Sequence, residues 1–111
     1  QEQCAFCRLR HTELLDAAHI IPDREDEGKP IVNNGMSLCK IHHAAFDANI
    51  IGIRPDHVIQ VNDRVLQEVD GPMLKYGIQQ MHNERIILPK SRKEWPDEEK
   101  LKVRYEQFQA G

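Results

Sequence analysis

The sequence predicts a small α+β domain that a bound zinc ion holds together, and three observations support this prediction. The chain has 111 residues, of which 40% are hydrophobic and 30% charged, and this suits one domain with a modest core. Cysteine and histidine residues form two closely spaced pairs in the first half of the chain. The apolar runs and their breaks then predict a strand, a long loop, a second strand and a helix.

The two pairs have the spacing of zinc ligands. Cys4 and Cys7 form C-x-x-C, and Cys39 and His42 form C-x-x-H; two such half-sites can close a tetrahedral zinc site. Three cysteines cannot all pair as disulfides, and no secretory signal opens the chain. The alternative is that the cysteines are small buried hydrophobic residues, but the double spacing favours structural zinc.

The first half contains the elements that place these ligands. An apolar stretch that Pro22 ends predicts the first strand, and a segment rich in proline, glycine and acidic residues predicts a loop. A helix is expected to follow the second strand directly. In chain order we expect a zinc knuckle at 4–8, a strand at 12–21, a loop at 22–35, a strand at 36–39 and a helix to about residue 47.

The second half predicts a hairpin and helices. β-Branched residues flank a Pro-Asp turn, and Gly71-Pro72 precedes a helical segment. Leu101, Tyr105 and Phe108 recur at helical spacing, which is more typical of a core face than of a site. We expect a hairpin from 50–54 and 58–61, a helix from 73 to about 81, a strand at 86–88 that Pro89 stops, and a final helix opened by 95–97.

Two adjacent histidines begin the first predicted helix. Neighbouring helical residues point about 100° apart, so His42 and His43 are expected to serve different centres. His42 completes the zinc set, whereas His43 shares a face with Asp47 four residues later. An imidazole and a carboxylate suit a catalytic divalent ion with open positions. The alternative for His43 and Asp47 is a surface ion pair.

Two further residues extend this pattern. His19 ends the first predicted strand, where a lone histidine is usually structural, and Asn34 stands five residues before Cys39. The order C-x-x-C, His19, Asn34, C-x-x-H, His43 resembles the HNH nuclease family, which has the ββα-metal fold. His42 replaces the usual fourth cysteine. The motifs AHIIP (18–22) and HHAAFD (42–47) resemble the bacterial restriction-type branch of that family.

The resemblance is strongest over the first half of the chain. It implies one nuclease domain over residues 1–111, with a core of about 4–53 and a C-terminal extension of about 54–111, cut from a longer protein. Many family members carry a metal-binding residue directly before the first histidine, where this chain has Ala18. Asp16 lies on the same strand face as Ala18 and is the candidate to replace this ligand of the catalytic ion, directly or through water.

The resemblance also implies a reaction and its residues. The chain is expected to hydrolyse DNA phosphodiester bonds, leaving 5′ phosphate and 3′ hydroxyl ends. His19 would be the general base, and Asn34 would brace its loop. The cofactors implied are a structural Zn²⁺ and a catalytic Mg²⁺, Mn²⁺, Ni²⁺ or Zn²⁺ held by His43 and Asp47.

The expected partners follow from the same resemblance. They are double-stranded DNA and a separate recognition domain of the same protein. The whole protein would be a restriction or anti-phage defence protein of the cytoplasm without membrane contact. Whether it forms a homodimer is left open. The formal net charge of −3 argues against a histone-like binder that relies on bulk positive charge, but not against binding of nucleic acid. Two basic clusters indicate a solvated face or, alternatively, phosphate contacts; they are Lys90, Arg92 and Lys93, and Lys100, Lys102 and Arg104.

Other classes of function remain open at this point. A non-catalytic zinc-knuckle module that binds nucleic acid would keep the four zinc ligands but would not need His19, Asn34, His43 and Asp47. A structural interaction domain would need none of these residues. A phage or toxin HNH nuclease would share the whole site.

Overall fold

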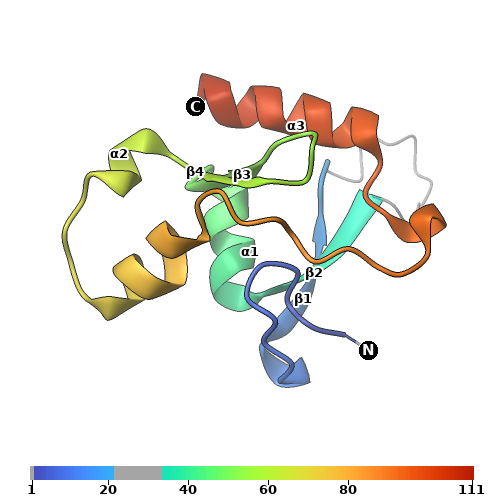
Figure 1. Ribbon diagram of the computed structural model, residues 1–111, viewed down its shortest axis with the longest axis horizontal. Coiled ribbons are helices and arrows are strands. Elements are labelled where there is room, and N and C mark those ends of the chain that lie inside the picture. Colours follow the sequence, from blue (N-terminus) through green and yellow to red (C-terminus); the bar gives the residue numbers. More distant parts are fainter. Residues whose placement is uncertain (1, 22–33) are drawn as a thin grey trace.

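The computed structural model describes residues 2–21 and 34–111 (Figure 1). It has the small α+β architecture that the sequence predicts, with short strands in two antiparallel pairs. The predicted loop at 22–35 lies outside the described residues except for its last two positions. The main elements are β1 (Leu15–His19), β2 (Gly35–Cys39), α1 (Lys40–Asp47), β3 (Ile51–Ile53), β4 (Ile59–Val61), α2 (Asp63–Leu66) and α3 (Glu98–Ala110).

The first pair, β1 and β2, leads directly into α1. Leu15 pairs with Cys39 and His19 with Gly35, so the end of β1 that carries His19 lies beside the start of β2. β1 is shorter than the strand predicted at 12–21, because Thr12–Leu14 form a 3₁₀ turn that a hydrogen bond from Leu14 N to His11 O closes at 2.8 Å. Cys39 caps α1, since its Sγ accepts a hydrogen bond from His42 N at 3.4 Å.

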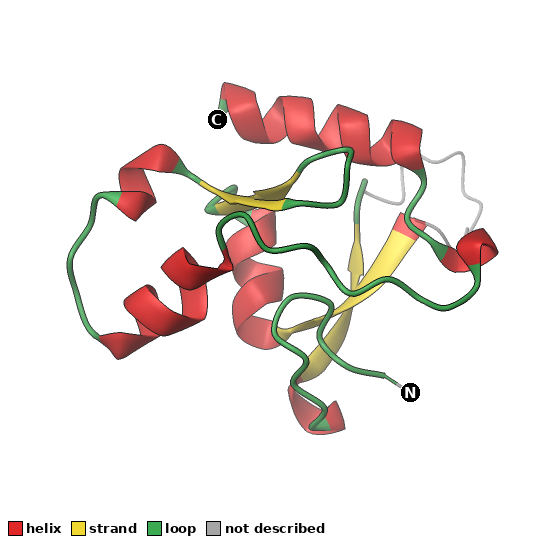
Figure 2. Cartoon of the chain, viewed as in Figure 1, coloured by secondary structure: helices red, strands yellow, loops and turns green. Residues whose placement is uncertain are grey.

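The second pair, β3 and β4, is the predicted hairpin and lies between α1 and α3 (Figures 1 and 2). Its two faces differ, because side chains alternate along each strand. Gly52 and Gln60 are paired and face α3, where Tyr105 Oη donates to Gln60 Oε1 at 2.8 Å. The other face carries Ile51, Ile53, Ile59 and Val61, all at most 2% exposed.

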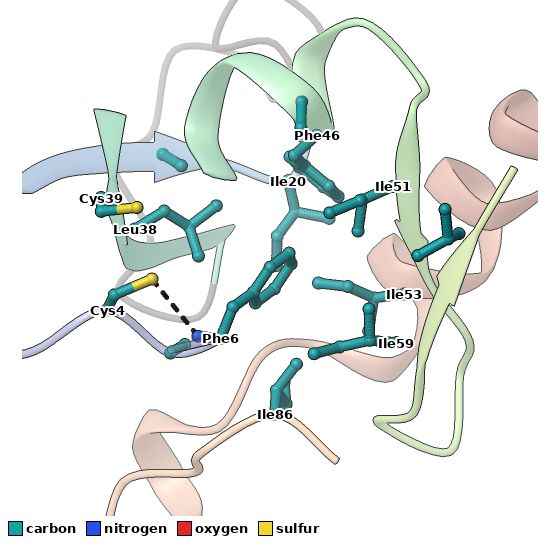
Figure 3. Packing of buried hydrophobic residues seen from close by; sticks show 14 of the residues in the cluster. Cys4, Phe6, Ile20, Leu38, Cys39, Phe46, Ile51, Ile53, Ile59 and Ile86 are labelled. Atoms are coloured by element: carbon teal, nitrogen blue, oxygen red, sulfur yellow. Dashed lines mark hydrogen bonds between the residues drawn. The ribbon is translucent and has the colours of Figure 1, made fainter. Parts of the chain in front are cut away.

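These four side chains belong to a single core that joins the two halves of the chain. Figure 3 shows Phe6 of the N-terminal loop among Ile20, Phe46, Ile53 and Ile59, so loop, strand, helix and hairpin share one apolar cluster. Burying a large apolar side chain stabilises a fold by about 1.5–3 kcal/mol. The first half of the chain therefore depends on the second for its core.

Between β4 and α3 the structure differs from the prediction in three places. The short helix α2 was not predicted. The helix expected from 73 to about 81 is a π-helical segment, η4 (Met73–Ile78), followed by a 3₁₀ turn, η5 (Gln79–Met81). The strand expected at 86–88 is wrong: Ile86 N donates to His57 O and Ile87 N to Ala5 O, so neighbouring residues bond to different segments and no ladder forms.

The final helix, α3, confirms the predicted helix at the C-terminal end. Asp97 caps it by accepting a hydrogen bond from Lys100 N at 3.0 Å. Leu101 and Phe108 are buried, as the apolar stripe predicts, but Arg104 is buried with them. Within the described ranges, none of the helices has the length and apolarity needed to cross a bilayer.

Candidate active site and metal centre

The structure brings the two predicted ligand pairs together in one group that can hold a metal ion. The ligand atoms of Cys4, Cys7, Cys39 and His42 all lie within 4.8 Å of one another. Cys7 is exposed, whereas the other three are buried. The N-terminal loop supplies the first pair, and the junction of β2 and α1 supplies the second. Three thiols and one imidazole in this arrangement are the donors that structural zinc prefers.

The orientation of His42 fits a role as a metal ligand. Its Nε2 lies 2.7 Å from Gly77 O, which requires Nε2 to carry the proton that the carbonyl accepts. Its Nδ1 then presents a lone pair to the thiols, 3.3 Å from Cys39 Sγ and 3.6 Å from Cys4 Sγ. A carbonyl that fixes the far nitrogen of a ligating histidine is a recurrent support of metal sites. Gly77 belongs to η4, and sequence reasoning missed it.

The three thiols differ in their acidity. Burial opposes ionisation of Cys4. When no metal is bound, a second proton on His42, at Nδ1, allows the ring to donate to Cys4, and this bond together with backbone amides outweighs burial and lowers the pKa of the thiol to about 6. Burial raises the pKa of Cys7 to about 12, and the negative charge of Cys4 adds to the effect. Burial also raises the pKa of Cys39. Cys4 is therefore the thiol that most readily offers a thiolate to a metal.

His43 points away from this group and lies between two carboxylates. Its Nδ1 is 2.8 Å from Asp16 Oδ2 on β1, and its Nε2 is 3.3 Å from Asp47 Oδ2 on the next turn of α1. If Nδ1 donates to Asp16, Nε2 and the Asp47 oxygen are two acceptors that face each other. A cation between these two atoms, either a proton or a metal ion, would stabilise this arrangement.

Asp16 lies behind His43, on the side away from Asp47. Its second carboxylate oxygen accepts a hydrogen bond from Lys40 Nζ at 2.7 Å. The hydrogen bonds from His43 and Lys40 stabilise the carboxylate and lower the pKa of Asp16. Asp16 thus holds the ring of His43 through Nδ1 and leaves Nε2 to face Asp47.

His19 lies in the same hollow as His43 and Asp47. These residues line a pocket of about 430 Å³, with Ile20, Asn49, Arg104 and Gln107 completing the wall. The pocket brings together the end of β1, one face of α1 and the C-terminal half of α3. A histidine that lines the pocket of an imidazole–carboxylate pair is placed to exchange protons with a water molecule or substrate there.

Asn34 is not in this pocket but fixes the backbone beside it. Its side chain is 1% exposed, and its amide makes two bonds with Ile21: Oδ1 accepts from Ile21 N, and Nδ2 donates to Ile21 O, both at 3.1 Å. Asn34 O also accepts a hydrogen bond from Ile20 N at 2.9 Å. These three bonds hold the two residues that directly follow His19.

Arg104 and Asn49 complete the pocket, and sequence analysis assigned neither to the site. The interpretation of Arg104 as part of a solvated basic face is wrong, because its side chain is buried. The sequence contained a sign of this burial, since Arg104 falls between Leu101 and Phe108 on the apolar face of α3. Burial lowers the pKa of Arg104, and the charge of Asp47 opposes this effect.

Residues 4–54 match the HNH endonuclease family model. This HNH segment contains both metal-ligand pairs, His19, Asn34, His43 and Asp47, and the match indicates a nuclease. It ends one residue after β3, so Arg104, Gln107 and Gly77 lie outside it. The searches of curated proteins and of solved structures returned no match.

Proposed function

We propose that this chain is a metal-dependent DNA endonuclease that hydrolyses phosphodiester bonds. The observation that carries the proposal is the pocket that His19, His43 and Asp47 share, separate from the Cys3His group. In this proposal β1, β2 and α1 form a ββα-metal core that structural zinc staples, and residues 1–111 form one nuclease domain. A non-catalytic zinc-knuckle module would not need His19, His43 and Asp47.

The residues of the pocket fit a catalytic divalent ion. His43 Nε2 and Asp47 Oδ2 would hold it, because they are two acceptor atoms close enough to share one cation. When bound, such an ion stabilises negative charge on the scissile phosphate and on the leaving oxygen. Asp16 orients His43 through Nδ1, and this orientation supports metal affinity in comparable sites.

In this proposal His19 is the group that accepts the proton. A neutral imidazole can take a proton from the attacking water molecule, and general base catalysis of this kind contributes roughly 10²- to 10⁴-fold in rate. Asn34 is a positioning residue, since it bonds to the backbone of Ile20 and Ile21 and thereby holds the chain that carries His19.

The AHIIP and HHAAFD motifs support a further proposal about the whole protein. In this proposal the chain is the cleavage part of a cytoplasmic restriction or anti-phage defence protein, and a separate domain selects the DNA. The described residues offer no exposed helix with the clustered arginine and asparagine side chains that read base edges.

Cleavage of supercoiled plasmid tests the proposed activity. We expect zinc-loaded protein to cut it when Mg²⁺, Mn²⁺ or Ni²⁺ is added and to stop cutting with EDTA. His19→Ala should keep the circular dichroism spectrum of the wild type and lose at least about a hundredfold in rate. His11→Ala is the matched control, because His11 is exposed and lies outside the pocket. If folded wild type that is supplied with metal does not cleave the plasmid, the proposal is rejected.

A further inference from the structure

Buried polar and charged side chains are few among the described residues, and one of them has no explanation in the proposed mechanism. Asn34, His42 and Arg104 form this group. Asn34 braces the chain after His19, and His42 belongs to the metal centre. Arg104 comes from α3, far from the HNH segment in sequence, yet it lines the wall of the pocket.

The protein partners of Arg104 are neutral. Its Nη1 donates to Asn49 Oδ1 at 2.6 Å and its Nη2 to Phe46 O at 2.5 Å, and its Cζ lies 4.6 Å from the centre of the Phe46 ring. Within residues 2–21 and 34–111, no carboxylate forms an ion pair with it. The charge of Asp47, on the same pocket wall, acts on the guanidinium without forming an ion pair with it. A buried cation that no carboxylate contacts directly is unfavourable, so this guanidinium favours an anion.

The pocket determines where that anion would lie. Arg104 shares the wall with His19, His43 and Asp47. Its two hydrogen bonds use two of the five N–H donors of a guanidinium, and they fix the plane of the group. A rigid guanidinium with donors to spare is the preferred protein partner of a phosphate oxygen.

We infer that Arg104 binds a phosphate oxygen of nucleic acid in this pocket. The inference rests on the proposed function and deepens it, because it assigns part of the substrate site to the C-terminal helix. His43 and Asp47 would hold the divalent ion on the α1 side of the pocket, and Arg104 would donate from α3 to an oxygen of the scissile phosphate or of its neighbour. The HNH segment would then carry the reacting groups, and α3 would carry the cation that binds the negatively charged phosphate of the substrate.

The first test removes the charge of Arg104. Arg104→Gln is compared with Lys102→Gln, which removes an exposed charge from the same helix. Binding of a DNA duplex is measured at several salt concentrations, with His19→Ala as the background of both variants so that the duplex stays intact. We expect Arg104→Gln to weaken binding by about tenfold to a hundredfold. The slope of log affinity against log salt should fall by about one.

Two further measurements separate a phosphate contact from a purely structural role. Mn²⁺ affinity at the His43–Asp47 pair and the melting temperature are recorded for both variants. An unchanged Mn²⁺ affinity together with a reduced salt slope supports the inference. A salt slope equal to that of Lys102→Gln overturns it, and so does a loss of Mn²⁺ binding that accounts for the whole effect.

A second pair of variants covers the case in which Arg104→Gln does not fold. Asn49→Asp keeps Arg104 and gives its guanidinium a carboxylate partner, whereas Gln107→Glu adds the same charge elsewhere on the pocket wall. We expect Asn49→Asp to keep the melting temperature and to weaken duplex binding more than Gln107→Glu does. The new carboxylate would pair with the Arg104 guanidinium, which would then no longer bind the phosphate. Equal weakening by both variants overturns the inference.

The outcomes also distinguish this inference from the proposed function. If wild type cleaves plasmid and Arg104→Gln binds and cleaves like Lys102→Gln, the inference fails and the nuclease proposal stands. If wild type binds DNA through Arg104 but cleaves with none of the metals, the nuclease proposal fails and the phosphate contact stands.

Discussion

His42 and His43 are neighbours in sequence but face different surroundings. His42 is 3% exposed, and it lies between the thiols and Gly77 O. His43 is half-buried and lies between Asp16 and Asp47. The separation follows from helix geometry, because consecutive side chains on α1 diverge by about 100°. One dipeptide thereby links the Cys3His group to the candidate active site.

The two histidines should give different phenotypes when each is replaced by alanine. His42→Ala removes one of the four proposed zinc ligands, so we expect the melting temperature to fall strongly or folding to fail. His43→Ala leaves the Cys3His group intact, so it should fold and lose cleavage because Asp47 alone holds a catalytic ion poorly. Thermal melts and plasmid cleavage check both. A folded, active His42→Ala beside an unfolded His43→Ala would reverse our assignment.

Asp16 should act on metal affinity through His43. Asp16→Asn weakens the charge-assisted bond to Nδ1, so we expect a folded protein whose Mn²⁺ affinity falls about tenfold to a hundredfold. Lys40→Met is the control, because it removes the other partner of Asp16 and leaves the bond to His43. Calorimetric titration with Mn²⁺ measures both. Equal affinities for wild type and Asp16→Asn would exclude the orienting role.

Residues of the site differ in how far the sequence alone could locate them. Cys4, Cys7, Cys39 and His42 stand in spacings that the geometry of zinc coordination imposes, so their grouping was predictable. Arg104 meets Asn49 across 55 positions. No local spacing encodes that contact, and its only trace is a charged residue on an apolar stripe.

At the scale of elements, the contact between α3 and the hairpin depends on a glycine. A Cβ atom at Gly52 would lie 2.5 Å from the ring of Phe108. Glycine therefore lets α3 approach β3 closely, and this approach brings Arg104 to the end of α1. The sequence predicts both the hairpin and α3, but not that they touch at this position.

Gly52→Ala should move α3 and reduce activity as well as stability. Overpacking of this kind costs about 1–3 kcal/mol, and the displaced helix would carry Arg104 out of place. Gly71→Ala is the matched control, since a Cβ there meets no atom within 4 Å, and we expect it to stay within about 0.5 kcal/mol. Chemical denaturation and plasmid cleavage test the pair. A Gly52→Ala protein as stable as Gly71→Ala would contradict the packing argument.

The elements that sequence reasoning misjudged share a physical cause. Backbone amides at Ile86 and Ile87 bond to separate segments, so β-branched composition there produced an extended chain without a sheet. In η4 the carbonyl of Gly77 accepts a hydrogen bond from His42. In both places the backbone bonds to partners that are distant in sequence, and these contacts outweigh the local secondary-structure propensity of the residues.

For the whole molecule, the metal centre should control folding. The Cys3His group joins the N-terminal loop to α1 and, through Gly77, to η4. Zinc binding contributes roughly 10 to 16 kcal/mol to the folding of small domains. We expect one zinc per chain in protein purified without added metal, and unfolding when a strong chelator removes it. Elemental analysis and circular dichroism provide the check; a folded, zinc-free chain would disprove the dependence.

The pairing of β3 with β4 has a consequence for any attempt to express the HNH segment alone. A chain cut after residue 54 would end just beyond β3 and would lack Ile59 and Val61 of β4, which pair with Ile53 and Ile51. β3 would then present open backbone hydrogen-bonding groups beside the apolar side chains of Ile51 and Ile53. Exposed apolar edges of this kind recruit strands from other molecules. We expect such a fragment to self-associate in light scattering, whereas a chain that extends through α3 stays dispersed.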